Sequence, residues 1–200
     1  MAGIYFMKVT LAIDTSTAKT QFAVLNGNEL KWLEIEDGAT THGDVLAKFG
    51  ELAAREEIDQ VIVGMGPGPF TGLRTGIIFA KSFAFARGLP IYGICSLDAI
   101  AFGINLPEFI IATDARRKEV YWARYEGGQR VEGPNVSTPN DLTSFAHLPI
   151  FGDGALKYNL TSDTEHLFPD LTSFPKLAES SKIDEPLYLS HPDAVPTAER

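Results

Sequence analysis

The sequence predicts a mixed α/β protein built from two related halves, of which the second is reduced. In the first half, apolar strand-like stretches alternate with amphipathic stretches of helical spacing. Two strand-like stretches end in aspartate, Leu11 to Asp14 and Ile111 to Asp114, and each is followed by a short turn and another strand. Prolines are frequent from Pro134 onward and leave room only for short elements there. Together these observations favour a duplicated fold around a cleft.

The elements of the first half follow from periodicity and turn signals. We expect strands at residues 9–14, 21–25 and 30–35, a helix at 44–57, a strand at 61–63, a helix at 72–87, a strand at 91–94 and a short helix at 97–102. Asn26–Gly27–Asn28 is a turn signal that joins two antiparallel strands. Gly88–Leu89–Pro90 ends the second helix. The later β-α-β order predicts right-handed crossovers and a partly parallel sheet.

The second half opens near Leu106–Pro107. An apolar strand is expected at residues 109–113, followed by an alternating strand at 119–125 that the Gly127–Gly128 pair turns back. We therefore divide the chain into an N-terminal α/β lobe, residues 1–105, and a smaller C-terminal α/β lobe, residues 106–200.

Composition excludes several classes of function. The chain has 200 residues and a formal net charge of −9, so bulk charge cannot attract a nucleic-acid backbone and any RNA contact needs a local basic patch. Cys95 is the single cysteine, which excludes an internal disulfide, and we expect it to be a buried apolar side chain. No apolar stretch spans a bilayer and no secretory leader is recognised, so a cytoplasmic protein without membrane contact is expected.

The turn after the first strand is a candidate nucleotide site. Asp14, Thr15 and Ser16 could offer a carboxylate to a hydrated metal, and hydroxyl and N–H groups to a phosphate. Asp114 would then lie beside the phosphates from the other half, giving an ATP-binding enzyme. The alternative is a β-turn in which these side chains bond their own backbone.

A glycine- and proline-rich loop, Gly64 to Arg74, precedes the second long helix. Its spacing fits neither the P-loop nor the dinucleotide fingerprint. Pro67 and Pro69 also lack the N–H groups that a phosphate cradle needs. We expect the loop to set how the helix leaves the sheet.

The second long helix combines small residues in four-residue steps with apolar residues on its other faces. Such a stripe allows another backbone to approach closely, and a helix apolar all round must be covered on two sides. We therefore predict a partner face made of Val45, Phe49, Leu52, Gly72, Gly76, Ile77, Ala80 and Phe83. The alternative is a core helix covered entirely by its own chain.

Catalytic and metal motifs are poorly represented. The four histidines show no ligand-pair spacing, so no metal site is expected. No nucleophile elbow is present, which leaves a peptidase unsupported and predicts no catalytic residues. Arg116, Arg117 and Lys118 form the densest basic cluster, either as a contact for an anion or RNA or as a solvated turn.

Several segments together resemble the bacterial TsaB (YeaZ) family. They include Leu11 to Thr17, Thr41 to Asp44, Gly66 to Arg74, Asp114 to Tyr121 and Gly152 to Ala155. The Gly-Pro-Gly-x-Phe-Thr-Gly-Leu-Arg segment is highly specific, and the matches run in order over most of residues 9–157.

The resemblance implies an actin-like, Hsp70-like ATPase-type (ribonuclease H-like) fold. It also implies a non-catalytic scaffold needed to make threonylcarbamoyladenosine next to the anticodon of tRNA. In that family the subunit pairs with the catalytic subunit TsaD and with the ATPase TsaE, and forms homodimers through the same helical face. The complex uses ATP, whereas no cofactor is expected on this chain alone and tRNA contact is expected only indirectly or locally.

Overall fold

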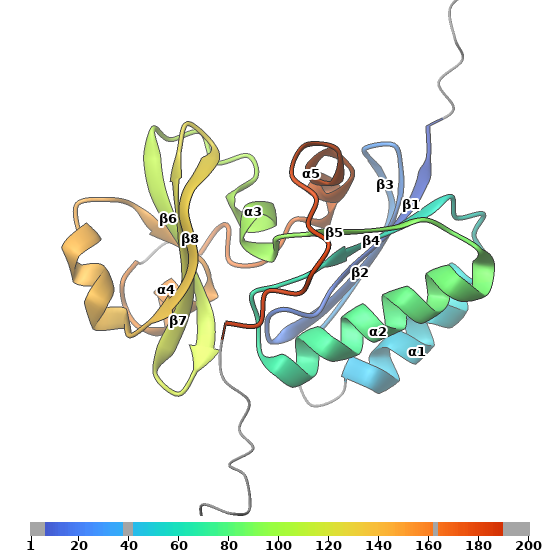
Figure 1. Ribbon diagram of the computed structural model, residues 1–200, viewed down its shortest axis with the longest axis horizontal. Coiled ribbons are helices and arrows are strands. Elements are labelled where there is room, and N and C mark those ends of the chain that lie inside the picture. Colours follow the sequence, from blue (N-terminus) through green and yellow to red (C-terminus); the bar gives the residue numbers. More distant parts are fainter. Residues whose placement is uncertain (1–6, 38–41, 162–163, 190–200) are drawn as a thin grey trace, which may run out of the picture.

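The computed structural model describes residues 7–37, 42–161 and 164–189 and contains two β-sheets side by side (Figure 1). The first sheet has the strand order β3-β2-β1-β4-β5. Its strands are β1 (Val9–Asp14), β2 (Lys19–Asn26), β3 (Glu29–Asp37), β4 (Gln60–Gly64) and β5 (Ile91–Ile94). The second sheet has the order β8-β7-β6-β9. Its strands are β6 (Glu108–Arg116), β7 (Glu119–Glu126), β8 (Gln129–Ser137) and β9 (Ile150–Phe151).

The two sheets repeat one topology, which confirms the predicted duplication. In each, three consecutive strands pair antiparallel, and a fourth strand pairs parallel with the first of them. The second half is the smaller one. Where the first has the helices α1 (His42–Ala53) and α2 (Phe70–Arg87), the second has the 3₁₀ helix η1 (Pro139–Phe145) and the short α4 (Asp153–Lys157).

One face of the first sheet is covered by α1 and α2, which lie side by side (Figure 1). Leu46 and Phe49 of α1, and Leu73 and Ile77 of α2, join the apolar face of the strands in one core cluster. The helix α1 ends at Ala53 rather than at residue 57 as predicted. The guanidinium of Arg87, at the end of α2, donates to the carbonyl oxygens of Ala53 and Glu56 and so holds the turn that follows α1.

The opposite face of the first sheet is covered by chain from the C-terminal half. The helices from that half are η2 (Leu171–Ser173) and α5 (Phe174–Ser180), and α3 (Ser96–Ala101) of the first half packs beside α5. Leu171 and Phe174 pack against the strands of the first sheet. The backbone N–H of Ile183 then donates to Gly93 O, and that of Leu187 to Met65 O, each at 2.8 Å. A division at residue 105 therefore separates the two sheets, but part of the chain after residue 105 packs on the first sheet.

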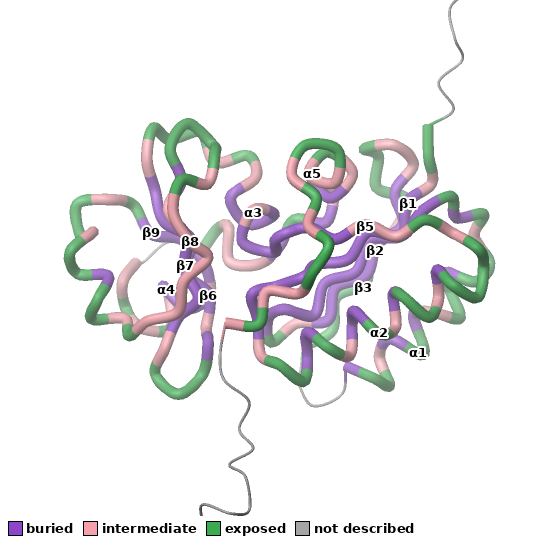
Figure 2. Tube along the Cα trace, in the orientation of Figure 1, coloured by how far each residue is buried: buried purple, intermediate pink, exposed green. Residues whose placement is uncertain are grey.

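Burial is concentrated on β1, β2 and β4 of the first sheet and on β6 and β7 of the second, as Figure 2 shows. Cys95 is fully buried as predicted, and burial raises the pKa of its thiol to about 12. In the parts of the chain that the structure describes, no helix is both long and apolar enough to cross a membrane.

Candidate functional site

The carboxylate of Asp14 is enclosed by hydrogen-bond donors of its own chain. Asp14 ends β1 and is 0% exposed. Its Oδ1 accepts from the N–H of Ser16 at 2.8 Å and from the Ser16 hydroxyl at 2.6 Å. Its Oδ2 accepts from the hydroxyl of Ser96 at 2.7 Å. Burial raises the pKa of Asp14, while these donors oppose the shift. Of the turn given as the alternative, the bond from Asp14 to its own backbone is present, whereas Thr15 bonds Gly72 O, and sequence analysis missed Ser96 as the third donor.

The glycine–proline loop lies directly on this turn. A Cβ atom added at Gly68 would lie 2.5 Å from Ser16 O and 2.7 Å from Ser16 Cα, so only glycine permits this approach. From the second half, the hydroxyl of Tyr121 donates to Gly68 O at 3.3 Å. The loop therefore seals the place where a phosphate would meet the turn, and Thr15 and Ser16 are each only 2% exposed.

Asp114, the counterpart of Asp14 in the second half, has a different environment. Its Oδ2 accepts from Lys157 Nζ at 2.6 Å, and its Oδ1 accepts from the Tyr158 hydroxyl and from the N–H of Arg116. The side chain is 22% exposed. Among the described residues no hydrogen bond or ion pair joins it to Asp14. Asp14, Thr15 and Ser16 are buried in the β1–β2 turn, whereas Asp114 is held by Lys157 and Tyr158 in the second half.

The small-residue stripe of α2 faces inward, which corrects the predicted partner face. A Cβ atom added at Gly76 would overlap Thr15 Oγ1 and lie 3.0 Å from Thr15 Cγ2. The Thr15 hydroxyl donates to Gly72 O at 2.8 Å, so the backbone that approaches the stripe is the chain's own β1–β2 turn. The buried members of the predicted face are Phe49, Gly72, Gly76, Ile77 and Ala80. Val45 and Phe83 are half-buried, and Leu52 is exposed.

The exposed side of α1 and α2 carries four apolar residues and one arginine, which we call the outer helical face. It consists of Leu52, Phe70, Arg74, Ile78 and Phe85. Ile78 is 50% exposed and Phe85 is 90% exposed. A hollow of about 490 Å³ is lined by Phe70, Thr71, Arg74, Thr75, Ile78 and Phe79. Phe70, Arg74 and Ile78 follow one another at four-residue spacing, and this pattern could have indicated the outer helical face from the sequence.

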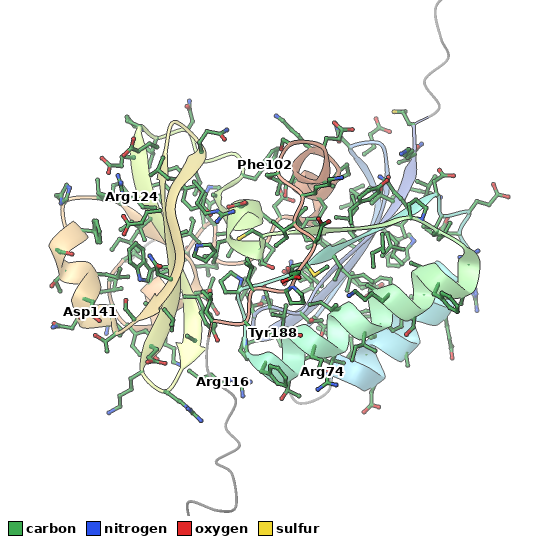
Figure 3. All side chains as sticks on the ribbon, viewed as in Figure 1. Arg74, Phe102, Arg116, Arg124, Asp141 and Tyr188 are labelled. Atoms are coloured by element: carbon green, nitrogen blue, oxygen red, sulfur yellow. The ribbon has the colours of Figure 1, made fainter. Side chains whose placement is uncertain are left out.

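The outer helical face continues into the C-terminal segment. The ring centroids of Phe70 and Tyr188 are 5.0 Å apart, and the guanidinium carbon of Arg74 lies 5.8 Å from the Phe70 centroid. Figure 3 shows Arg74 and Tyr188 at the N-terminal end of α2. Aromatic and cationic side chains thus frame the hollow at this end of the helix.

The predicted basic cluster forms the β6–β7 turn. Arg116, Arg117 and Lys118 are exposed and have φ angles of 63°, 47° and 62°.

Burial, together with the positive charge of Arg116, lowers the pKa of His42. His42 contacts the Thr20 hydroxyl through Nδ1, and both residues are buried. Within residues 7–37, 42–161 and 164–189 no three His, Cys, Asp or Glu side chains are grouped as a metal site.

Comparisons with known proteins agree on one family. A family model described as TsaD, tRNA N6-adenosine threonylcarbamoyltransferase, matches residues 46–174. An uncharacterized protein of Mycobacterium tuberculosis is 37% identical over 205 residues, which cover 96% of each chain. The Escherichia coli tRNA threonylcarbamoyladenosine biosynthesis protein TsaB is 34% identical over 134 residues, which cover 58% of this chain and 54% of that one.

Two solved structures from Pseudomonas aeruginosa share the fold. One is YeaZ, with a TM-score of 0.68, and the other is an uncharacterized protein with similarity to peptidase YEAZ, with a TM-score of 0.70. Each is 23% identical to this chain, and each comparison covers 92% of this chain and 100% of the other. With a matching family model over more than half its length and TsaB among its relatives, the chain belongs to the TsaB (YeaZ) family.

Proposed function

We propose that this chain is a non-catalytic scaffold in the biosynthesis of threonylcarbamoyladenosine in tRNA. Relatives from Escherichia coli and Haemophilus influenzae are named for that biosynthesis. The observation that carries the non-catalytic role is the enclosure of Asp14, which is 0% exposed and accepts three hydrogen bonds from serines. A carboxylate so enclosed cannot reach a hydrated metal or a phosphate without opening the fold. This subunit is therefore expected to hold no cofactor by itself, while the complex uses ATP.

The partner surface that we propose is the outer helical face. Exposed apolar side chains beside a hollow are typical of a docking site, and Arg74 adds a charged group at its rim. A stable pairing needs about 800 Å² of buried surface on each side. We propose that a TsaD-like catalytic subunit binds here, that the homodimer uses the same face, and that a TsaE-like ATPase joins the pair.

The test mixes this chain with the TsaD-like subunit of the same organism and measures mass by light scattering after size exclusion. The wild type should form a heteromeric complex at the expense of its homodimer. Ile78→Glu, which places a charge at a half-exposed position of the face, should weaken both assemblies. Val131→Glu is the matched control, because Val131 is 47% exposed but lies on β8 of the second sheet.

Complexes that survive Ile78→Glu unchanged would contradict the outer helical face as the docking surface. A wild-type chain that stays monomeric and binds no TsaD-like subunit would contradict the scaffold itself. The competing reading, an ATP-binding enzyme, predicts nucleotide turnover by the isolated chain that Asp14→Asn abolishes. We expect no turnover in either protein.

Direct contact with tRNA, where it occurs, is proposed for the β6–β7 turn. Arg116, Arg117 and Lys118 project together from a chain of net charge −9, so they form a local basic patch. Changing all three to glutamine should weaken tRNA binding by the assembled complex in a filter assay. Unchanged binding at low salt would remove the turn from the interface.

A further inference from the structure

The strand β3 is an edge strand that nothing covers in the described part of the chain. In the first sheet it pairs only with β2, and from Trp32 to Asp37 this pairing is regular. The other hairpin edge, β8, is interrupted by Gly133–Pro134 and by two register shifts. Proline and bulges protect an edge from pairing with another chain, and the regular part of β3 has neither.

One face of β3 presents three exposed apolar side chains. Leu30, Leu33 and Ile35 are 44%, 40% and 44% exposed. The layer over this face of the sheet stops at β2, where Lys19 Nζ lies 4.3 Å from the ring centroid of Phe168 and Gln21 Nε2 donates to Pro169 O. A hollow of about 530 Å³ remains between β3 and the segment 164–172.

The hollow also contains a buried acceptor without a partner. Gln21 lines it and is only 4% exposed. Among the described residues the Oε1 atom of Gln21 has no hydrogen-bond partner, although its Nε2 is satisfied by Pro169 O. Buried acceptors in folded proteins nearly always find a donor. A hydrogen-bond donor on one of the hollow-facing side chains of a bound segment would supply one, whereas side chains over Glu34 and Glu36 lie on the other face of the sheet.

Charge on β3 indicates what kind of chain fits. Glu34 and Glu36 alternate with the apolar residues and have no ion-pair partner among the described residues, whereas Lys31 is paired with Glu56 at 2.6 Å. In the register centred on Ile35, a second copy would place Glu34 opposite Glu36 of the other copy, and like charges directly opposite each other destabilise that pairing. A basic segment is attracted instead.

We propose that β3 and the adjacent hollow bind an extended basic segment of another protein by β-strand addition. Its backbone pairs with the open edge, its apolar side chains contact Leu33 and Ile35, and its alternate basic side chains face Glu34 and Glu36. This mode derives affinity from main-chain hydrogen bonds and specificity from alternate side chains. The surface is separate from the outer helical face, so the inference does not depend on the proposed scaffold role.

The test uses the full chain and an alternating Lys–Val octapeptide carrying a fluorophore, with anisotropy as the readout. Two control peptides keep the length. One replaces the two central valines with prolines and keeps the charge, and the other replaces every lysine with glutamate. Leu33→Thr combined with Ile35→Thr retains strand propensity and should weaken binding about tenfold by removing apolar contact. Val131→Thr on β8 is the matched control and should leave binding unchanged.

Strand addition also predicts slower hydrogen exchange in Trp32 to Asp37 when the Lys–Val peptide is present. Glu34→Gln with Glu36→Gln should weaken binding and reduce its salt dependence. Equal binding of the proline peptide, or equal weakening by Val131→Thr, would show non-specific charge attraction and overturn the proposal. A homodimer that dissociates in the Leu33→Thr, Ile35→Thr protein would assign the edge to a second copy and overturn it as well. Ile78→Glu should leave peptide binding unchanged, which separates this test from that of the scaffold.

Discussion

Replacing Gly76 by alanine is expected to destabilise the chain, although alanine is the better helix former. In an exposed helix interior this change stabilises by about 1 kcal/mol. At Gly76 the new methyl group would overlap Thr15 Oγ1 and lie 3.0 Å from Thr15 Cγ2. Overpacking of this kind costs about 1–3 kcal/mol. Displacing Thr15 also breaks its bond to Gly72 O and leaves a buried hydroxyl unpaired, at a cost of about 1–3 kcal/mol. The net expectation is a loss of about 3 kcal/mol.

The assay is urea unfolding followed by tryptophan fluorescence, since Trp32 lies in the first sheet and Trp122 in the second. Gly43→Ala in α1 is the control, because a Cβ atom there meets nothing within 4 Å, and it should raise stability. Thr15→Ala removes the obstructing atoms, so the double variant Thr15→Ala, Gly76→Ala should lose less than the sum of the two single variants. A Gly76→Ala protein that gains stability as Gly43→Ala does would refute the inward orientation of the stripe.

Three further outcomes concern buried polar groups, all measured by urea unfolding. Burial raises the pKa of Asp14 in the folded chain, so the wild type should lose stability relative to Asp14→Asn as the pH rises above about 4; a constant difference would contradict this. Burial and the charge of Arg116 lower the pKa of His42, so the wild type should lose stability relative to His42→Gln as the pH falls below about 6.5, and parallel pH profiles would argue against it. Arg130→Met should cost about 2 kcal/mol because Asp98, 11% exposed and 2.9 Å from Arg130 Nε, loses its cation. Adding Asp98→Asn should recover part of that loss, and no recovery would show that packing rather than charge was removed.

Strand positions could be predicted from the sequence because their apolar runs are short, dense and bounded by turn residues. The stretches 9–14 and 91–94 were predicted with the bounds that β1 and β5 have. The two apolar stretches followed by aspartate indicated the duplication, although β6 runs on past Asp114 to Arg116, and the proline-rich C-terminal part indicated the reduced half. These features are local sequence patterns, which can be recognised without knowing the fold.

The end of α1 was predicted less well. The helix was predicted to reach residue 57 but stops at Ala53, and Arg87 of another helix binds the carbonyl groups of Ala53 and Glu56 in the turn that follows. The position of residues 171–187 on the first sheet could not be predicted from local sequence patterns either. Their short elements carry too little periodicity to show that they return to the first sheet.

The sequence by itself determined the fold class, the duplication and the family, because hydrophobic period and motif order are properties of neighbouring residues. Only the tertiary structure decided how these pieces face each other. The helix α2 is apolar on nearly every side, so its periodicity could not show that Gly76 meets Thr15 while Ile78 faces solvent. Nor could it show that Ser96, 82 residues from Asp14, would complete the enclosure of that carboxylate. Orientation and closure depend on long-range contacts, and those form only when the chain packs.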